Sequence, residues 1–173
     1  MPTKGECFKK ARILLVDDDP DSSELVSHYL ADHDMVIKLA TSGQEALDAV
    51  ESFVPDVIVT DVRMPNMTGD TLLSDLHSRG YKKPVLFLTG YDDLGTLLRS
   101  YDHGLLGFLQ KPIDPEILAA VIRRFARLEF QRRVAEGTIA QLAKIAYSCL
   151  PDESEEGLIS KARNAAVSIV NAT

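Results

Sequence analysis

The chain of 173 residues contains two cysteines, no tryptophan and no long apolar run. Cys7 and Cys149 are far apart in the sequence and lack the spacing of metal ligands, which argues against a disulfide framework and a zinc site. Neither an apolar run of about 18 residues nor the apolar core of a secretory signal is present, so we expect no membrane attachment and a cytoplasmic location. These absences favour a soluble globular protein with one main core.

Basic residues are in the minority over most of the chain, and histidine is missing from its C-terminal part. Residues 1–115 carry 19 acidic against 11 basic side chains, so electrostatic repulsion from nucleic acid is expected there. The part after residue 128 has no histidine, which excludes a histidine phosphotransfer helix. Its last amphipathic stretch begins with Glu155-Glu156 instead of basic residues, so we do not expect this chain to bind DNA.

Asp61 stands directly after the apolar run of residues 57–60 (VIVT) and before a loop that contains proline and glycine. A carboxylate at the end of a buried strand is placed for chemistry more often than for packing. An aspartate carboxylate can accept a phosphoryl group and form an acyl phosphate. Asp61 is therefore a candidate phosphoryl acceptor.

Three other apolar runs also end in polar residues, namely Asp17-Asp18, Thr89 and Lys111. The carboxyl ends of parallel strands line one crevice, so we expect these side chains to surround Asp61. Asp17 and Asp18 would help to bind Mg²⁺, which prefers oxygen ligands. Lys111 would pair with one phosphoryl oxygen and Thr89 would donate to another. Taken singly, each of these residues is as well explained by a cap or a turn, so the hypothesis depends on their joint occurrence.

Four stretches of the sequence resemble the receiver domains of two-component response regulators, of which the chemotaxis receiver is the minimal example. They are residues 13–20 (ILLVDDDP), 57–69 (VIVTDVRMPNMTG), 85–90 (VLFLTG) and 108–112 (FLQKP), in the family's order and close to its spacing. The alternation of strands and helices predicts an α/β fold with a doubly wound, five-stranded parallel sheet. The resemblance implies the flavodoxin-like strand order 2-1-3-4-5.

The resemblance also implies a metal site and a phosphorylation site. Asp61 corresponds to the phosphorylated residue and Asp18 to the direct ligand of Mg²⁺ or Mn²⁺. Asp17 corresponds to the second member of the acidic pair, which often acts through water. The backbone carbonyl of Arg63 would be a third ligand.

Further roles are implied for residues around this site. Thr89 and Lys111 correspond to the family's switch hydroxyl and lysine, and Phe108 falls where the family has a rotating aromatic residue. Arg63 and Tyr91 stand two residues after Asp61 and Thr89, where side chains flank the entry of the attacking water. Their bulk suggests slow autodephosphorylation.

The function implied is that of a signalling domain and not of a conventional enzyme. A histidine kinase or a phosphotransfer protein would phosphorylate Asp61, and the domain would then switch conformation and signal through a partner or through self-association. Two alternatives remain open: a phosphorylation-independent adaptor, and the N-terminal receiver of a larger regulator with a missing output domain. A phosphatase of the dehalogenase type is a weaker reading, because Asp21 stands where that family has threonine or valine.

Apolar periodicity predicts the elements of this fold. The expected strands are residues 12–16, 35–40, 56–60, 84–88 and 107–110. The expected helices are residues 20–32, 43–53, 71–79 and 92–102, followed by one that opens at Asp114-Pro115. In the first helix, Leu25, Val26, Tyr29 and Leu30 form the expected apolar face.

We expect a loose leader over residues 1–11, the receiver domain over 12–128 and a helical extension over 129–173. Apolar residues in a 4-3 spacing, interrupted by Arg132, form a seam like that of a coiled coil along residues 121–149. Gly137-Thr138 reads as a stop and restart, so one helix or two remain possible. A break at Pro151 and a further helix predict an αα-hairpin. We favour dimerisation for this extension, with packing on the receiver domain or a missing partner domain as alternatives.

Overall fold

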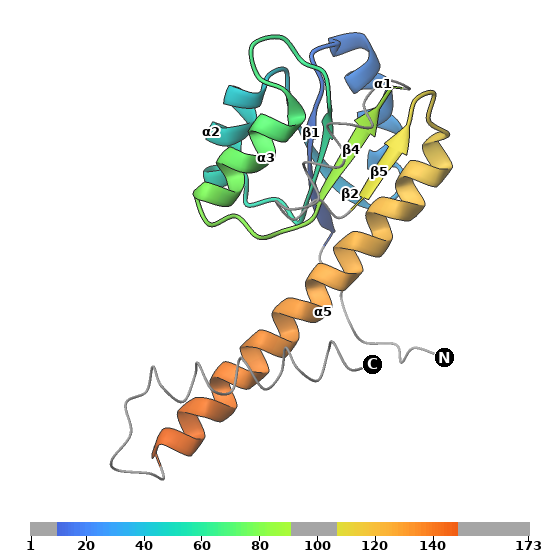
Figure 1. Ribbon diagram of the computed structural model, residues 1–173. Coiled ribbons are helices and arrows are strands. Elements are labelled where there is room, and N and C mark those ends of the chain that lie inside the picture. The colour runs from blue at the N-terminus through green and yellow to red at the C-terminus, as the bar shows by residue number, and fades with distance from the viewer. Residues whose placement is uncertain (1–9, 91–106, 149–173) are drawn as a thin grey trace. The chain divides into compact units, whose positions relative to one another are not determined.

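The structure is a computed structural model that describes residues 10–90 and 107–148, with side chains in the second range as far as residue 141 (Figure 1). The chain divides into two compact units, Met1–Arg127 and Leu128–Thr173, and each is described by itself. The predicted boundaries of leader, receiver domain and extension stay predictions.

The first unit is built around five parallel strands. They are β1 (Ala11–Val16), β2 (Met35–Ala40), β3 (Val57–Asp61), β4 (Val85–Thr89) and β5 (Gly107–Gln110). Their order in the sheet is β2-β1-β3-β4-β5, and every neighbouring pair is parallel. The predicted doubly wound sheet with order 2-1-3-4-5 is therefore confirmed.

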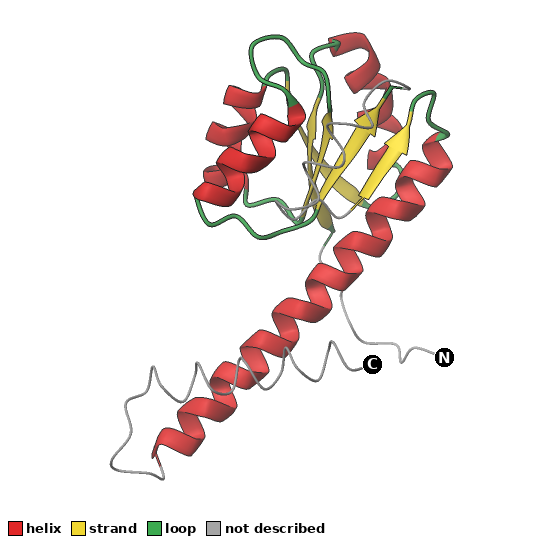
Figure 2. Ribbon diagram, in the orientation of Figure 1, coloured by secondary structure: helices red, strands yellow, loops and turns green. Residues whose placement is uncertain are grey.

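Helices alternate with these strands (Figure 2). They are α1 (Pro20–Ala31), α2 (Gly43–Phe53), α3 (Gly69–Ser78) and α5 (Pro115–Ser148). The helix predicted over residues 92–102 lies outside the described residues. Within residues 10–90 and 107–148, none of the helices combines the length and the apolarity that crossing a membrane requires.

Two apolar layers hold the helices on opposite faces of the sheet. Successive strand residues point to opposite faces, so both faces of the central strands are buried. On one face Leu14 and Ile58 pack with residues of α2 and α3. On the other face Leu15 and Val59 pack with Leu30 of α1 and with the first turns of α5.

Helix α1 begins as predicted, and its expected apolar face packs on the core except for Leu25. Asp19 is the N-cap, and its Oδ1 accepts hydrogen bonds from the backbone N–H groups of Asp21 (3.1 Å) and Ser22 (3.4 Å). Leu30 is fully buried, whereas Leu25 is 74% exposed. Val26 and Tyr29 are partly buried against the same core as Leu30, so the expectation of a packed face is wrong for Leu25 alone.

Helix α5 runs without a break through Gly137 as far as Ser148. The hydroxyl of Thr138 donates to the carbonyl of Val134 (2.9 Å) and does not cap a new helix. Of the two alternatives, one helix or two, the structure therefore shows one helix as far as Ser148. The predicted break at Pro151 and the second helix of the αα-hairpin lie outside the described residues.

The C-terminus of α2 contains a strained residue. Val54 has the left-handed dihedral angles φ 45° and ψ 66°, and its N–H closes the helix on the carbonyl of Val50. A β-branched side chain disfavours this conformation, which glycine adopts freely. Because the Val54 side chain is about half exposed, replacing it loses little packing.

We therefore expect Val54→Gly to raise the free energy of unfolding by about 1 kcal/mol, measured by urea denaturation. Val36→Gly is the matched control, because Val36 is also partly exposed but lies within β2. The control should lose stability, since glycine weakens a strand. A loss of stability in Val54→Gly equal to that of the control would contradict the expectation.

Candidate functional site

The carboxyl ends of the strands bring four of the predicted residues to one edge of the sheet. Asp61 and Thr89 are the last residues of β3 and β4, and Asp17 and Lys111 follow β1 and β5 directly. The backbone N–H of Lys111 donates to the carbonyl of Thr89 (2.8 Å), and that of Asp17 donates to the carbonyl of Ala40 (3.1 Å). Backbone pairing thus continues beyond the strands and fixes where these side chains begin.

The side chain of Lys111 bridges the carboxylates of Asp17 and Asp61. Its Nζ donates to Oδ2 of Asp61 at 2.5 Å and to Oδ2 of Asp17 at 3.3 Å. The remaining oxygens accept from the backbone: Oδ1 of Asp61 from Arg63 N–H, and Oδ1 of Asp17 from Asp19 N–H, both at 3.0 Å. Both carboxylates are therefore held in fixed orientations before any ligand binds.

The charge of Lys111 is secured by these contacts. Burial acts to lower the pKa of Lys111, but the hydrogen bond and negative charge of Asp61, together with those of Asp17, outweigh it and raise the pKa above the ordinary value of lysine. The ammonium is consequently protonated throughout the physiological range. A permanent positive charge lies beside the Asp61 carboxylate.

Three carboxylates at this edge fit a divalent cation. Asp17, Asp18 and Asp61 each offer an oxygen, and these oxygens lie within 4.8 Å of one another. Asp17 is buried and Asp61 partly buried, whereas Asp18 is exposed and leaves its side open to water. Magnesium prefers a small number of carboxylates and keeps several waters, so the donor set suits it. The backbone N–H of Arg63 donates to Oδ1 of Asp61. The role of the Arg63 carbonyl as a metal ligand stays a prediction.

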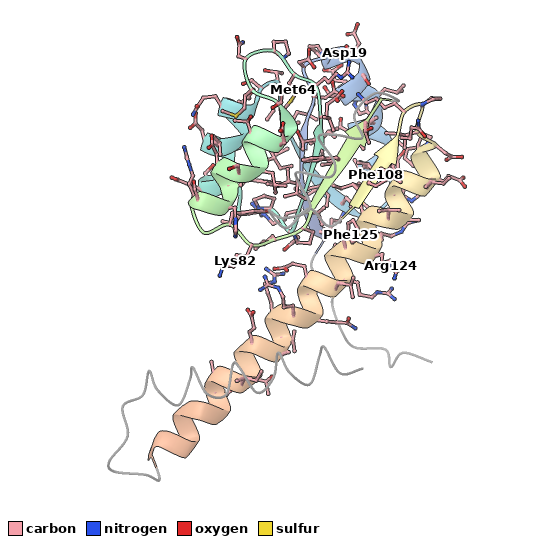
Figure 3. The ribbon with its side chains drawn as sticks, in the orientation of Figure 1. Asp19, Met64, Lys82, Phe108, Arg124 and Phe125 are labelled. Carbon is pink, nitrogen blue, oxygen red and sulfur yellow. The ribbon has the colours of Figure 1, made fainter. Side chains whose placement is uncertain are left out.

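Two other predicted residues lie on the strands that lead to this edge. Thr89 is buried, and its hydroxyl donates to the carbonyl of Gly90 (2.7 Å). Phe108 lies on β5 with half of its surface exposed (Figure 3). Figure 3 also shows Asp19 and Met64 at the end of the sheet toward which the strands run. Tyr91 lies outside the described residues.

A cavity of about 400 Å³ adjoins the site on the side of α1. Asp17 and Lys111 line it together with apolar residues of α1 and of the loop after β5, among them Leu25, Tyr29 and Ile113. The cavity could not be expected from the sequence, because the apolar pattern of α1 places Leu25 on the packed face of the helix.

The model of the "Response regulator receiver domain" family matches residues 13–123. Response regulator Rre1 of Synechocystis sp. is 33% identical over 136 residues, which cover 77% of this chain and 59% of that protein. The DNA-binding transcriptional regulator NtrC of Escherichia coli is 32% identical over 117 residues, which cover 68% of this chain and 25% of that protein. The chain thus spans only part of the length of these relatives.

Solved structures show the same likeness. Chemotaxis protein CheY4 of Vibrio cholerae is 34% identical, with a TM-score of 0.63, and the match covers 66% of this chain and 98% of that one. A structure described as adenylate cyclase from Rhodopirellula baltica is 30% identical, with a TM-score of 0.70, over 75% and 97% of the two chains. Full-length FixJ from B. japonicum is 26% identical, with a TM-score of 0.68, over 83% and 70%.

Proposed function

Because this chain belongs to the receiver domain family of two-component response regulators, we propose that a histidine kinase or a phosphotransfer protein phosphorylates it on Asp61. The reaction requires Mg²⁺ or Mn²⁺. The observation that carries this proposal is the bridge that Lys111 makes between Asp17 and Asp61, next to three carboxylates spaced for one cation.

In the transfer step, an oxygen of the Asp61 carboxylate attacks the phosphorus atom of a phosphohistidine. A P–O bond forms and the P–N bond breaks, and its electron pair stays on the imidazole. Lys111 neutralises charge on the transferred group, and the Thr89 hydroxyl donates to it after leaving Gly90. A cation held by Asp17, Asp18, Asp61 and the Arg63 carbonyl would neutralise further phosphoryl charge.

One experiment separates this function from its alternatives. The protein is incubated with Mg²⁺ and acetyl phosphate, and wild type is compared with Asp61→Ala and with Asp21→Asn, an exposed aspartate outside the site. A labile adduct that disappears only in Asp61→Ala is the expected result on a phosphate-affinity gel. Steady hydrolysis of phosphomonoesters would indicate a phosphatase, and no adduct with no turnover would indicate an adaptor.

The cavity beside α1 is the proposed docking place of the phosphodonor protein. Leu25 is 74% exposed and lines this cavity with Asp17 and Lys111, so an apolar partner surface that buries Leu25 would lie next to Asp61. Contiguous apolar surface with a polar rim marks protein contacts, and Leu25 lines the cavity together with Tyr29 and Ile113.

We expect Leu25→Glu to slow phosphorylation by a histidine kinase by about tenfold or more, because burying a charge disfavours the complex. Phosphorylation by acetyl phosphate should not change, since the Leu25 side chain is 74% exposed and the fold buries little of it. The kinase is the one that phosphorylates wild type fastest in a screen, and Val36→Glu serves as control. Equal slowing with both phosphodonors would contradict the docking role.

The lifetime of the phosphorylated state is proposed to depend on Arg63 and Tyr91. The Arg63 side chain is exposed and its backbone N–H donates to Oδ1 of Asp61, which supports a role of this side chain in the access of water. We expect Arg63→Ala and Tyr91→Ala to accelerate loss of the acyl phosphate by several-fold, of the order of 1 kcal/mol. Decay at the wild-type rate in both variants would end this idea.

The signal is proposed to leave the domain through a conformational switch that involves Thr89 and Phe108. Residues 129–173 are proposed to form a homodimer. Leu128 and Val134 are each about half exposed, which leaves apolar surface on α5 for a second copy. Light scattering before and after addition of a beryllofluoride mimic tests whether the mass changes with phosphorylation.

A further inference from the structure

The loop of residues 62–68, here called the phosphorylation loop, joins Asp61 to α3, and its first part is anchored in the core by the buried side chains of Val62 and Met64. Its ends are tied together by the hydrogen bond from Gly69 N–H to the Val62 carbonyl (2.9 Å). Between them, Asn66 has a left-handed φ of 68°, and Met67 N–H donates to the Pro65 carbonyl (2.8 Å). In the described structure, the middle of the loop therefore contacts the rest of the fold through its side chains.

Met67 provides one of these contacts by packing against the start of α2. Its side chain is partly buried against the core on that face. A Cβ added to Gly43, the first residue of α2, would lie 2.8 Å from Met67 Cγ and 3.1 Å from Met67 Cβ. Gly43 is thus a place where the absence of a side chain makes room for the loop.

The backbone of Gly43 does not itself require glycine. Its φ is outside the left-handed region, and glycine is less favourable than alanine in a helix. The start of α2 is also held in place, because Ser42 caps Glu45 N–H and the Glu45 carboxylate accepts from Thr41 N–H (2.8 Å). A side chain at Gly43 would therefore displace Met67 rather than the helix.

Displacing Met67 would disturb Asp61. Rotation of the thioether can move the Met67 Sδ and Cγ atoms away, but Met67 Cβ, which is bonded to the backbone, would still have to shift by a few tenths of an ångström. The same loop contains Arg63, whose N–H holds Oδ1 of Asp61 at 3.0 Å. Small errors in the position of a reacting group reduce rates by large factors.

We infer that Gly43 and Met67 are positioning residues: their contact fixes the phosphorylation loop and, through Arg63 N–H, the orientation of the Asp61 carboxylate. The inference rests on the proposed phosphorylation of Asp61 and adds to it a dependence on the start of α2. Gly43, which lies outside the cluster of Asp17, Asp18 and Asp61, thus affects both metal binding and phosphoryl transfer.

The test is a double-mutant cycle with two readouts. The rate of phosphorylation is measured with acetyl phosphate at saturating Mg²⁺, and the Kd for Mg²⁺ is measured by calorimetry without phosphodonor. Gly43→Ala should lower the rate and weaken Mg²⁺ binding by about tenfold in each case. In the Met67→Ala background the same change should alter either quantity by less than about twofold, because Met67 Cγ, which would lie 2.8 Å from the added Cβ, is removed together with the thioether.

Gly137→Ala is the matched control, since Gly137 is also helical but a Cβ there meets no atom within 4 Å. It should leave the rate and the Kd unchanged. If Gly43→Ala is poorly folded, the double variant still decides, because relief by Met67→Ala is expected only for a steric contact. A Gly43→Ala change that impairs the Met67→Ala protein by the same factor as wild type, or a Gly43→Ala protein equal to wild type, would overturn the inference. A wild-type protein that gains no phosphate on Asp61 would instead refute the proposed function.

Discussion

Replacing Lys111 by methionine is expected to slow the phosphorylation of Asp61 by about a hundredfold or more. The Lys111 ammonium lies 2.5 Å from Asp61 Oδ2 and is positively charged across the physiological range. Methionine keeps much of the length of the side chain but provides no charge and no donor for the transferred oxygens. The rate with acetyl phosphate at saturating Mg²⁺ measures the effect.

Lys83→Met is the matched control for this prediction. Lys83 Nζ donates to the Pro55 carbonyl (3.1 Å), and both residues precede the starts of their strands, at the edge of the sheet away from Asp61. The control should keep the wild-type rate. If Lys111→Met is phosphorylated as fast as this control, the proposed role of Lys111 is wrong.

Replacing Gly69 by alanine is expected to have the second large effect, on stability as well as on phosphorylation. A Cβ at Gly69 would lie 2.6 Å from the Asp61 carbonyl oxygen and 3.2 Å from Val62 Cα. Both are backbone atoms, and the Val62 carbonyl accepts a hydrogen bond from Gly69 N–H. The overlap can therefore be relieved only by moving the end of β3. We expect a loss of about 2–3 kcal/mol in the free energy of unfolding and little phosphorylation.

Gly80→Ala separates this steric effect from a general effect of losing glycine. Gly80 has a φ of 79°, but a Cβ there meets no atom within 4 Å. Its substitution should cost about 1 kcal/mol in backbone strain and leave phosphorylation intact. Urea denaturation and the phosphate-affinity gel measure both variants. A Gly69→Ala protein that loses no more stability than Gly80→Ala and is phosphorylated normally would contradict the account.

The sequence predicts the sheet because buried parallel strands leave a clear mark on it. The run before Asp61 is apolar at every position but one, as a strand covered on both faces requires, and β3 lies there. Polar residues after such runs predict one shared site, and the contacts of Lys111 with Asp17 and Asp61 agree with that. The order of the strands follows from family resemblance, because periodicity does not say which strands are neighbours.

Other features depend on contacts that local patterns do not encode. Apolar periodicity places Leu25 on the same face of α1 as Leu30. It does not show how far around the helix the core extends, and Leu25 is exposed. Gly137 looks like a stop signal, yet one glycine disfavours a helix by only about 1 kcal/mol, and α5 continues. The packing of Met67 on Gly43 joins the loop after Asp61 to the first residue of α2 and depends on the path of that loop, so it required the structure.

Chemical trapping of the phosphorylated residue tests the central claim most directly. Borohydride reduces an acyl phosphate to an alcohol but leaves free carboxylates and phosphate esters intact, so it marks the acceptor aspartate for mass spectrometry. After incubation with acetyl phosphate and Mg²⁺, the account predicts a reduced side chain at Asp61 alone, and none when EDTA replaces Mg²⁺. Labelling at another residue, or equal labelling of Asp61 in EDTA, would contradict it.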